Sequence, residues 1–283
     1  MLADARLEPF FRGADRLGVR SAWWGHVPFA FWLIQAARPE VLVELGTYSG
    51  VSYSAFCQAV LTENLPCRCH AVDTWEGDGH AGHFTEAVFD DFKQFHDARY
   101  AKISTIHRGT FLEANAKFSD GSIDLLHIDG LHTFEAVRAD FEAWLPKMSP
   151  RGVVLFHDAA ERRLDFGVWR MWEQVCNRWP SFLFDHSHGL GVLAVGADCP
   201  PAIANLCSSG PERRALLQER FAILGTRWYG GGLWETQTGN SDREDPEAEL
   251  YRLRAIETST IWRATAPIRA VGERMARFRK PRS

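Results

Sequence analysis

The segment from Val41 to Ser52, VLVELGTYSGVS, restricts the fold more than any other part of the chain. An apolar run that ends in an acid and is followed by two spaced glycines is typical of a strand, a tight turn and a helix. In a parallel sheet such a turn lies at the carboxyl end of a strand, where ligands bind. We therefore predict a cofactor site that includes Glu44, Gly46, Thr47, Gly50 and Ser52.

The glycine turn lacks residues that two common nucleotide-binding sites require. No Gly-Lys-Ser/Thr follows the turn, so the sequence does not predict a triphosphate cradle. The third glycine of the dinucleotide fingerprint is missing, which argues against an NAD(P)-dependent oxidoreductase. Asp73 ends the next apolar run, 29 positions after Glu44, and we expect it to accept hydrogen bonds from ribose hydroxyls.

Apolar runs and helical patterns alternate along residues 39–198, which predicts the fold class α/β. We expect a doubly wound, mostly parallel, Rossmann-like sheet with an antiparallel edge hairpin formed by strands near 182–185 and 190–195. The flanking parts are expected to be a helical flank or lid (1–38), a helical appendage (199–235), and a linker with a basic amphipathic tail (236–283).

Three local expectations follow from turn residues. The stretch from Thr74 to Phe84 is expected to be a long polar loop. Its part Gly77–His83 is expected to close over the cofactor or contact the acceptor, and a solvated flexible loop is the alternative. Pro150–Gly152 is expected to turn into a strand over Val153–Phe156, and Gly230–Gly232 to belong to a linker.

Composition narrows the class of protein. Of the 283 residues, 46% are hydrophobic and 24% charged, which is ordinary for a soluble globular chain, and the net charge of −4 argues against a nucleic-acid partner. The six cysteines are expected to be free thiols, because Cys67 and Cys69 have no second pair to complete a zinc site. With no run of 18 apolar residues and no signal-peptide pattern, we expect a cytoplasmic protein.

Charge is concentrated at the end of the chain. From Leu250 to Ser283 there are nine Lys and Arg against two Glu, on an amphipathic pattern. Such a segment is typical of a peripheral contact with an anionic membrane or with a partner, and a solvated tail is the alternative. The stretch Ser259–Pro267 is similar to segments of bacterial surface-polysaccharide glycosyltransferases, which favours contact with such an enzyme; a homo-oligomer is compatible with the sequence as well.

Polar side chains follow two neighbouring strands. Asp129 and His132 come after one apolar run, and His157 and Asp158 come after the next. Side chains at adjacent strand ends converge, and this mixture of oxygen and imidazole ligands suits Mg, Mn, Fe or Zn. The alternatives are a helix cap, a turn acid and a buried histidine. His132 begins a helix, which would lower its pKa, and a neutral imidazole there can act as a general base.

From Glu44 through Gly50 to Asp73 the chain resembles the class I S-adenosylmethionine-dependent methyltransferases. The resemblance implies S-adenosyl-L-methionine as cofactor. From their positions in the chain, Trp75 is then expected near the adenosine, and Gly109 and Thr110 against the adenine, with plain packing or turn roles as the alternatives. A divalent metal favours transfer to oxygen, because a hydroxyl has a high pKa whereas a neutral amine needs no such help.

Four segments narrow the resemblance to bacterial macrolide sugar O-methyltransferases acting on mycinamicin and macrocin precursors. They are Val43–Thr47, Ala71–Asp78, His127–Glu135 and Gly152–Asp158. The likeness implies Asp129, His157 and Asp158 as ligands of Mg or Mn, His132 as catalytic base, and a sugar or glycan hydroxyl as acceptor. This chain has His157 where those enzymes have an acid. That difference favours the alternative of a non-catalytic cofactor-binding or scaffolding module.

Overall fold

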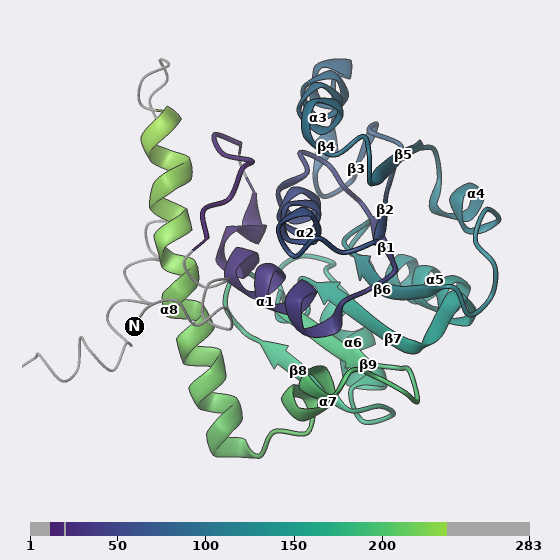
Figure 1. Ribbon diagram of the computed structural model, residues 1–283, viewed down its shortest axis with the longest axis vertical. Coiled ribbons are helices and arrows are strands. Elements are labelled where there is room, and N and C mark those ends of the chain that lie inside the picture. The colour runs from purple at the N-terminus through teal and green to yellow at the C-terminus, as the bar shows by residue number, and fades with distance from the viewer. Residues whose placement is uncertain (1–11, 20, 237–283) are drawn as a thin grey trace, which may run out of the picture.

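The computed structural model describes residues 12–19 and 21–236. Seven strands form one sheet in the order β5-β2-β1-β6-β7-β9-β8 (Figure 1). Neighbours pair in parallel up to β7, and β9 pairs antiparallel with both β7 and β8. The mostly parallel sheet and its antiparallel edge hairpin are therefore confirmed. The strands are β1 Val41–Leu45, β2 Arg68–Asp73, β5 Ser104–Arg108, β6 Ile123–Ile128, β7 Met148–His157, β8 Ser181–Phe184 and β9 Leu190–Ala194.

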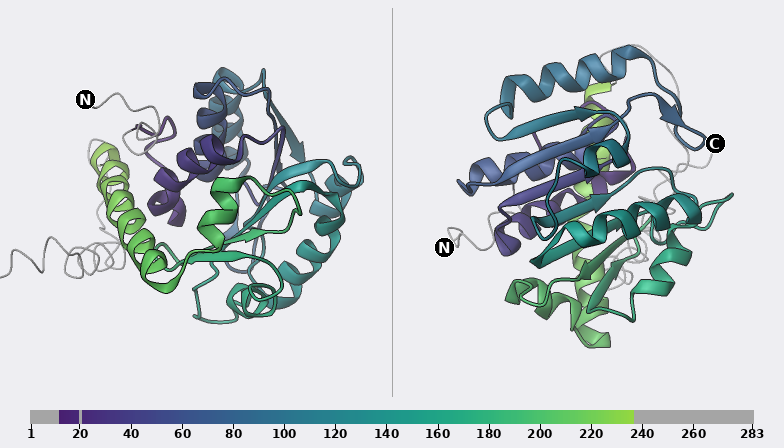
Figure 2. Two further views of the ribbon diagram at one scale, coloured as in Figure 1. Left: turned by 60° about the horizontal axis from the view of Figure 1, so that its bottom comes forward. Right: turned by 90° about the vertical axis from the view of Figure 1, so that its right-hand side faces the viewer.

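Helices cover both faces of this sheet (Figure 2). One layer contains the 3-10 helix η2 Ala22–His26 and the helices α1 Val27–Ala37, α2 Val51–Thr62, α3 Glu86–Arg99, α7 Pro201–Cys207 and α8 Pro211–Thr236. The other contains α4 Phe111–Asn115, α5 Phe134–Trp144 and α6 Val168–Val175, with the 3-10 turn η3 Leu145–Lys147 after α5.

The strands divide their side chains between two cores. In β1, Leu42 packs in the cluster below α1 and α2, whereas Val43 packs in the cluster below α5 and α6. This alternation follows from the two-residue period of a strand, and burial on both faces explains why the central strands are nearly all apolar. Glu44 lies two residues after Leu42, so its side chain points to the same face of the sheet as that of Leu42, toward α2.

The N-terminal flank belongs mainly to the core. Trp23, Trp24, Phe29 and Phe31 are at most 4% exposed, so burial of aromatic area is their main contribution. Helix α8 packs against η2 and α1. A Cβ on Gly225 would lie 2.3 Å from the carbonyl oxygen of Gly25, which shows how closely the two backbones approach.

Three local expectations were wrong. The expected loop 74–84 contains a small hairpin of β3 Gly77–Asp78 and β4 Gly82–His83. Strand β7 begins at Met148, because residues 149–152 form a bulge against β6 and the carbonyl of Pro150 accepts a bond from the amide of Asp198. Helix α8 continues through Gly230–Gly232, since its packing on η2 overrides the weak helix propensity of glycine.

The expected basic tail, residues 236–283, lies almost wholly outside the described residues. Within the part of the chain that the structure covers, no helix is long and apolar enough to cross a membrane. All six cysteines fall within that part and are free thiols, as expected.

Candidate active site

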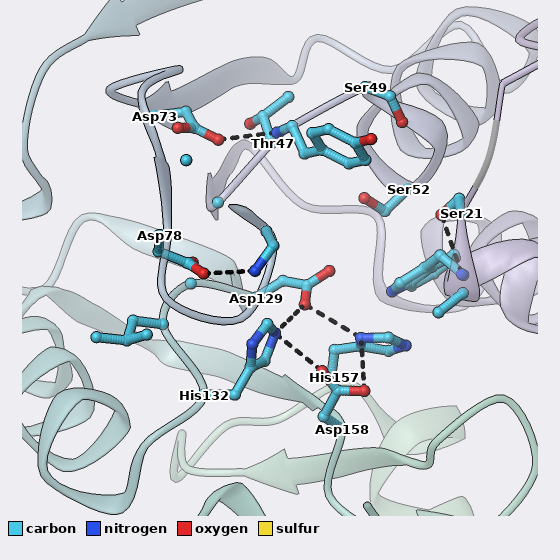
Figure 3. Close-up of a pocket in the computed structure, with 18 of the residues that line it drawn as sticks. Ser21, Thr47, Ser49, Ser52, Asp73, Asp78, Asp129, His132, His157 and Asp158 are labelled. Carbon is cyan, nitrogen blue, oxygen red and sulfur yellow. Dashed lines mark hydrogen bonds and ion pairs between the residues drawn. The ribbon is translucent and has the colours of Figure 1, made fainter. Parts of the chain in front are cut away.

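A cavity of about 440 Å³ lies at the carboxyl ends of the central strands (Figure 3). Its volume is in the range of small-molecule sites. The predicted site residues that line it are Gly46, Thr47, Ser52, Asp73, Thr110, Asp129, His132, His157 and Asp158. Glu44, Gly50, Trp75 and Gly109 were predicted as well but do not line it.

The turn after β1 forms one wall of the cavity. Gly46 has φ of +87°, and a Cβ there would lie 2.0 Å from the carbonyl oxygen of Asp129, so no other residue fits without displacing the backbone. The next residue, Thr47, is buried, and its Oγ1 has no hydrogen-bond partner among the described residues. A buried hydroxyl without a partner is costly unless a ligand completes it, which fits a polar ligand in this cavity.

Asp73 ends β2 and anchors the same turn. Its Oδ2 accepts a hydrogen bond from the amide of Tyr48 at 2.8 Å, and its Oδ1 accepts one from the amide of Trp75 at 2.7 Å. Burial raises the pKa of Asp73, while these amide donors oppose the shift. Asp73 therefore ties the ends of β1 and β2 together at the edge of the cavity.

The predicted site residues that do not line the cavity pack behind its wall. Trp75 is buried, stacks on Phe92 and donates from Nε1 to the carbonyl of Tyr48 at 2.9 Å. Gly50 has φ of +79° and lies so close to Phe92 that a Cβ would approach the ring to 2.4 Å. The glycine is thus required by packing between α2 and α3. Glu44 is fully buried and contacts His127.

Gly109 and Thr110 lie at the end of β5. Both line a second, smaller cavity, and Thr110 lines the main one too. Thr110 caps α4, because its Oγ1 accepts a hydrogen bond from the amide of Glu113. The side chain of Glu113 in turn accepts a hydrogen bond from the backbone amide of Thr110. The contact of these two residues with an adenine ring remains a prediction.

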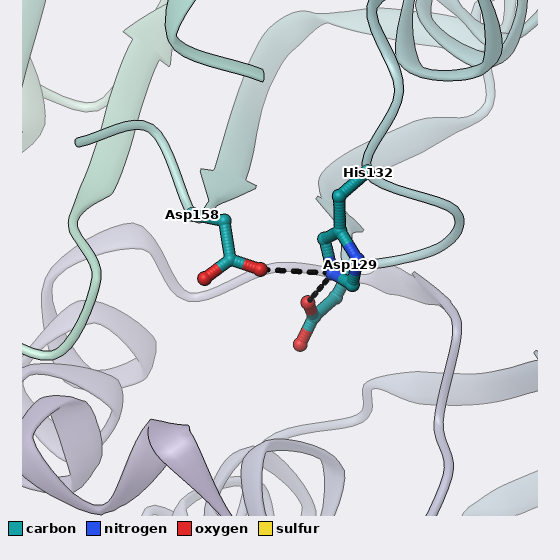
Figure 4. A group of neighbouring side chains, drawn as sticks. All are labelled: Asp129, His132 and Asp158. Carbon is teal, nitrogen blue, oxygen red and sulfur yellow. Dashed lines mark hydrogen bonds and ion pairs between the residues drawn. The ribbon is translucent and has the colours of Figure 1, made fainter. Parts of the chain in front are cut away.

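Two carboxylates and two imidazoles meet at the ends of β6 and β7 (Figure 3), and Figure 4 shows Asp129, His132 and Asp158 among them. Nε2 of His132 lies 2.8 Å from Oδ2 of Asp158 and 3.4 Å from Oδ1 of Asp129. Nδ1 of His157 lies 3.1 Å from the same oxygen of Asp129 and 3.5 Å from Oδ1 of Asp158. Asp158 has a left-handed φ of +58°, a conformation that is uncommon outside glycine but that aspartate adopts more readily than most residues.

These contacts set the protonation of the cluster. Burial opposes ionisation of Asp129, but attraction to His157 and the hydrogen bonds with both histidines hold the pKa of Asp129 well below its usual range. Burial likewise opposes a charge on His132, yet its hydrogen bonds with Asp129 and Asp158 raise the pKa of His132 to about 10. The expectation that the helix start would lower this pKa is therefore wrong, because two carboxylates outweigh one helix end.

The donor chemistry of the cluster fits a divalent cation. Asp129, His132 and Asp158 each offer one ligand atom, and these atoms all lie within 4.8 Å of one another. Two carboxylates with one imidazole suit Mn or Mg. His157 is not part of this group, although it contacts both carboxylates; its role as a ligand remains a prediction.

Several lining residues were not among the predicted site residues, although Trp23 belongs to the segment 1–38 that was expected to be a flank or lid. Tyr48 and Phe84 stack at 4.5 Å between ring centroids at the rim. Ser21 and Trp23 reach the cavity from η2 and the residue before it. Tyr48 stands inside the glycine motif, so its position could have indicated its role, whereas Ser21 and Trp23 carry no motif that would.

The central part of the chain is similar to a known protein family. Residues 43–159 match a family model described as a methyltransferase domain. The matched range begins in β1 and ends just after β7, so it contains Gly46, Asp73 and the whole acid–imidazole cluster.

One curated relative, protein y4gI of Sinorhizobium fredii (strain NBRC 101917 / NGR234), is described as uncharacterized. It is 45% identical over 243 residues, which are 85% of this chain but 26% of the relative. The chain thus spans about a quarter of the length of the relative that it matches.

Two solved structures are similar at low identity. A putative caffeoyl-CoA O-methyltransferase from Staphylococcus aureus shares 15% identity, with 59% of this chain and 80% of that chain covered and a TM-score of 0.47. The O-methyltransferase TomG from Streptomyces achromogenes, in complex with SAM, shares 15% identity, with 68% and 86% covered and a TM-score of 0.47.

Proposed function

We propose that this protein is an S-adenosylmethionine-dependent O-methyltransferase that acts on a sugar or glycan hydroxyl, assisted by Mg or Mn, in polysaccharide or glycoconjugate biosynthesis. The observation that carries the proposal is that Asp129, His132 and Asp158 lie on the same cavity as Asp73 and the Gly46 turn. The match of residues 43–159 to a methyltransferase domain supports the reaction class.

The residues of β1 and β2 are proposed to bind the cofactor. Gly46 lets the backbone approach the ligand, the unpaired Oγ1 of Thr47 is available for a hydrogen bond, and Asp73 is available to ribose hydroxyls. Bound S-adenosylmethionine supplies a methyl group on a positively charged sulfur, which is already activated for transfer. The protein therefore has to align the acceptor oxygen and remove its proton.

The residues of β6 and β7 are proposed to do this. His132 is the candidate base, because Asp129 and Asp158 flank its Nε2 and stabilise the imidazolium that forms when it takes a proton. A divalent cation held by Asp129 and Asp158 would stabilise the developing alkoxide and weaken the hold of these carboxylates on the His132 proton. His157 contacts both carboxylates and keeps them in place.

Calorimetry tests the proposal. The purified protein is titrated with S-adenosylmethionine after exhaustive chelation and again with Mg or Mn restored, with NADH as a competing ligand. We expect micromolar binding of S-adenosylmethionine that NADH does not displace. No binding in either condition would contradict the proposal, and displacement by NADH would point to an oxidoreductase.

A turnover assay then separates an enzyme from a binding module. Methyl glycosides of common hexoses are offered with catechol as a phenolic comparator, and methyl ethers are detected by mass spectrometry. We expect product from a glycoside only when the metal is present. Cofactor binding without product from any acceptor would favour the non-catalytic module. Product from catechol alone would contradict the sugar acceptor.

A further inference from the structure

Two segments approach each other beside His132. The β3–β4 hairpin comes from the end of β2, and residues 159–167 come from the end of β7. Oδ1 of Asp78 accepts hydrogen bonds from the amides of His80 and Ala81, both at 2.7 Å, and so fixes the tip of the hairpin. Asp78 and Ala81 line the cavity, whereas His80 does not.

The side chain of His80 turns away from solvent toward the other segment. Only 8% of it is exposed, although it stands on a hairpin tip. Its Nε2 lies 2.7 Å from Oδ1 of Asp165, and its ring stacks on Phe166 with 4.5 Å between centroids and 14° between planes. His80 is thus the residue through which the hairpin contacts segment 159–167.

The same segment holds His132. Phe166 lies 5.1 Å from the His132 ring at 14°, and His80 lies 5.6 Å from it at 27°. The amide of Gly167 donates to the carbonyl of His132 at 2.7 Å. His132 therefore has two carboxylates at its Nε2 and two nearly parallel rings beside it, and these contacts restrain the plane of its imidazole.

We propose that His80 is a positioning residue, which holds the His132 imidazole in its orientation toward Asp129 and Asp158 by packing with Phe166. This inference rests on the proposed function, in which His132 is the base. A base that is displaced by a fraction of an ångström or rotated loses much of its effect, so a contact that fixes its ring contributes to rate without touching the acceptor.

The stacking of His80 on Phe166, rather than its ion pair with Asp165, should hold the His132 ring in its orientation. Asp165 is 72% exposed, and exposed pairs of this kind contribute little. Replacing His80 by Phe keeps a ring against Phe166 but removes the bond to Asp165, whereas His80→Ala removes both. Asp165→Asn removes only the charge of the pair. Gly79→Ala is a matched control at the hairpin tip, because a Cβ there meets nothing within 4 Å.

The primary measurement does not depend on turnover. The ring proton resonances of His132, assigned through the His132→Gln spectrum, are compared by NMR at one fixed pH in the metal-free protein. A ring that packs on Phe166 feels its ring current, so we expect His80→Ala to shift these resonances and His80→Phe, Asp165→Asn and Gly79→Ala to leave them close to those of the wild type. Unchanged resonances in His80→Ala would overturn the inference.

The second measurement uses the methyl glycoside that the wild type methylates fastest. We expect kcat of His80→Ala to fall by about 10- to 100-fold, with the S-adenosylmethionine dissociation constant within about twofold of wild type. His80→Phe should retain kcat to within about threefold. Equal losses in His80→Ala and His80→Phe would overturn the role of stacking. If the wild type methylates no glycoside, the proposed function has failed, and the His132 resonances alone decide the inference.

Discussion

The indole N–H of Trp23 donates a hydrogen bond to Nε2 of His127 at 3.2 Å. Since an indole nitrogen only donates, this Nε2 carries no proton, and Nδ1 of His127 donates to Oε2 of Glu44 at 2.8 Å. All three side chains are at most 1% exposed. A buried chain of hydrogen bonds therefore joins the N-terminal flank to β6 and β1, directly behind the cavity.

Replacing His127 by Phe should destabilise the protein strongly. Phe keeps a ring of similar size but leaves the Trp23 N–H without an acceptor and removes the His127 donor from Oε2 of Glu44, at about 1–3 kcal/mol for each buried group. Urea unfolding measures the loss. Trp23→Phe is the companion variant: it removes the donor and part of a buried ring but leaves the bond between His127 and Glu44 in place. A His127→Phe midpoint equal to that of the wild type would refute the chain as a stabilising feature.

The position of Glu44 shows what sequence reasoning found and missed. The acid at a strand end next to Gly46 correctly indicated the turn and the cavity. Glu44 itself has the parity of Leu42, which is buried below α1 and α2, and so its side chain enters the core instead of the cavity. Its partner His127 lies 83 positions away, and no local pattern reveals such a pair.

The acid–imidazole cluster was easier to predict than its chemistry. Asp129, His132, His157 and Asp158 each follow a recognisable apolar strand, and parallel strands bring their ends to one edge. The distances between these side chains depend on the register of β6 against β7. That register includes a bulge that no sequence pattern predicts. The pKa of His132 follows from those distances, so it was predicted in the wrong direction.

A series of glycine substitutions should separate backbone strain from steric overlap. Gly79→Ala should change neither stability nor binding of S-adenosylmethionine, because the added Cβ meets no atom within 4 Å. Gly121 has φ of +70° with open space around it, so Gly121→Ala should cost about 1–2 kcal/mol from its left-handed backbone alone. Gly46→Ala adds the overlap with the Asp129 carbonyl and should cost more, with binding lost.

Urea unfolding and calorimetric titration with S-adenosylmethionine measure these three variants side by side. Gly121 precedes β6 and so lies at the opposite end of that strand from Asp129, and it does not line the cavity. Gly121→Ala should therefore bind the ligand as the wild type does. Binding by Gly46→Ala at wild-type affinity would show that the close approach of β1 to Asp129 is not needed for the site.

Asp140 on α5 should make stability depend on pH. Burial raises the pKa of Asp140 to about 6, from 3.8 in an unconstrained carboxyl. The folded state therefore favours the protonated form, and this stabilisation is complete below about pH 4 and is lost as the pH rises through 6. Asparagine cannot ionise, so Asp140→Asn avoids the cost of burying a charged carboxylate. It should therefore stabilise the protein at pH 7 by up to about 3 kcal/mol and by nothing at pH 3.5.

Unfolding midpoints of the Asp140→Asn variant and the wild type at several pH values between 3.5 and 7.5 provide the test. A constant difference between Asp140→Asn and the wild type across this range would mean that Asp140 does not ionise with a raised pKa.

Arg16 should contribute to cofactor binding from a distance. Its Nε donates to the carbonyl of Ser49 at 3.1 Å, inside the glycine turn, and its guanidinium pairs with Asp91 on α3. Arg16→Met removes both contacts and should weaken S-adenosylmethionine binding by about 3- to 10-fold, the equivalent of one hydrogen bond. Asp91→Asn keeps the bond to Ser49 and should bind normally. Equal weakening in both variants would assign the effect to the ion pair instead.

His132→Ala should separate binding from chemistry. Loss of a general base lowers kcat by about 10²- to 10⁴-fold, whereas the residues proposed to contact the cofactor lie at the ends of β1 and β2 and stay unchanged. Single-turnover methylation and calorimetry with S-adenosylmethionine measure the two effects separately. His83→Ala is the matched control, since His83 is exposed and does not line the cavity. In the proposed arrangement Asp129 and Asp158 hold the metal and His132 stays free to take the proton, so Mn titrations should show metal binding close to that of the wild type in the same variant. A variant that keeps wild-type kcat but binds the metal more weakly would assign His132 to the metal site, and the base would have to be sought elsewhere on the cavity.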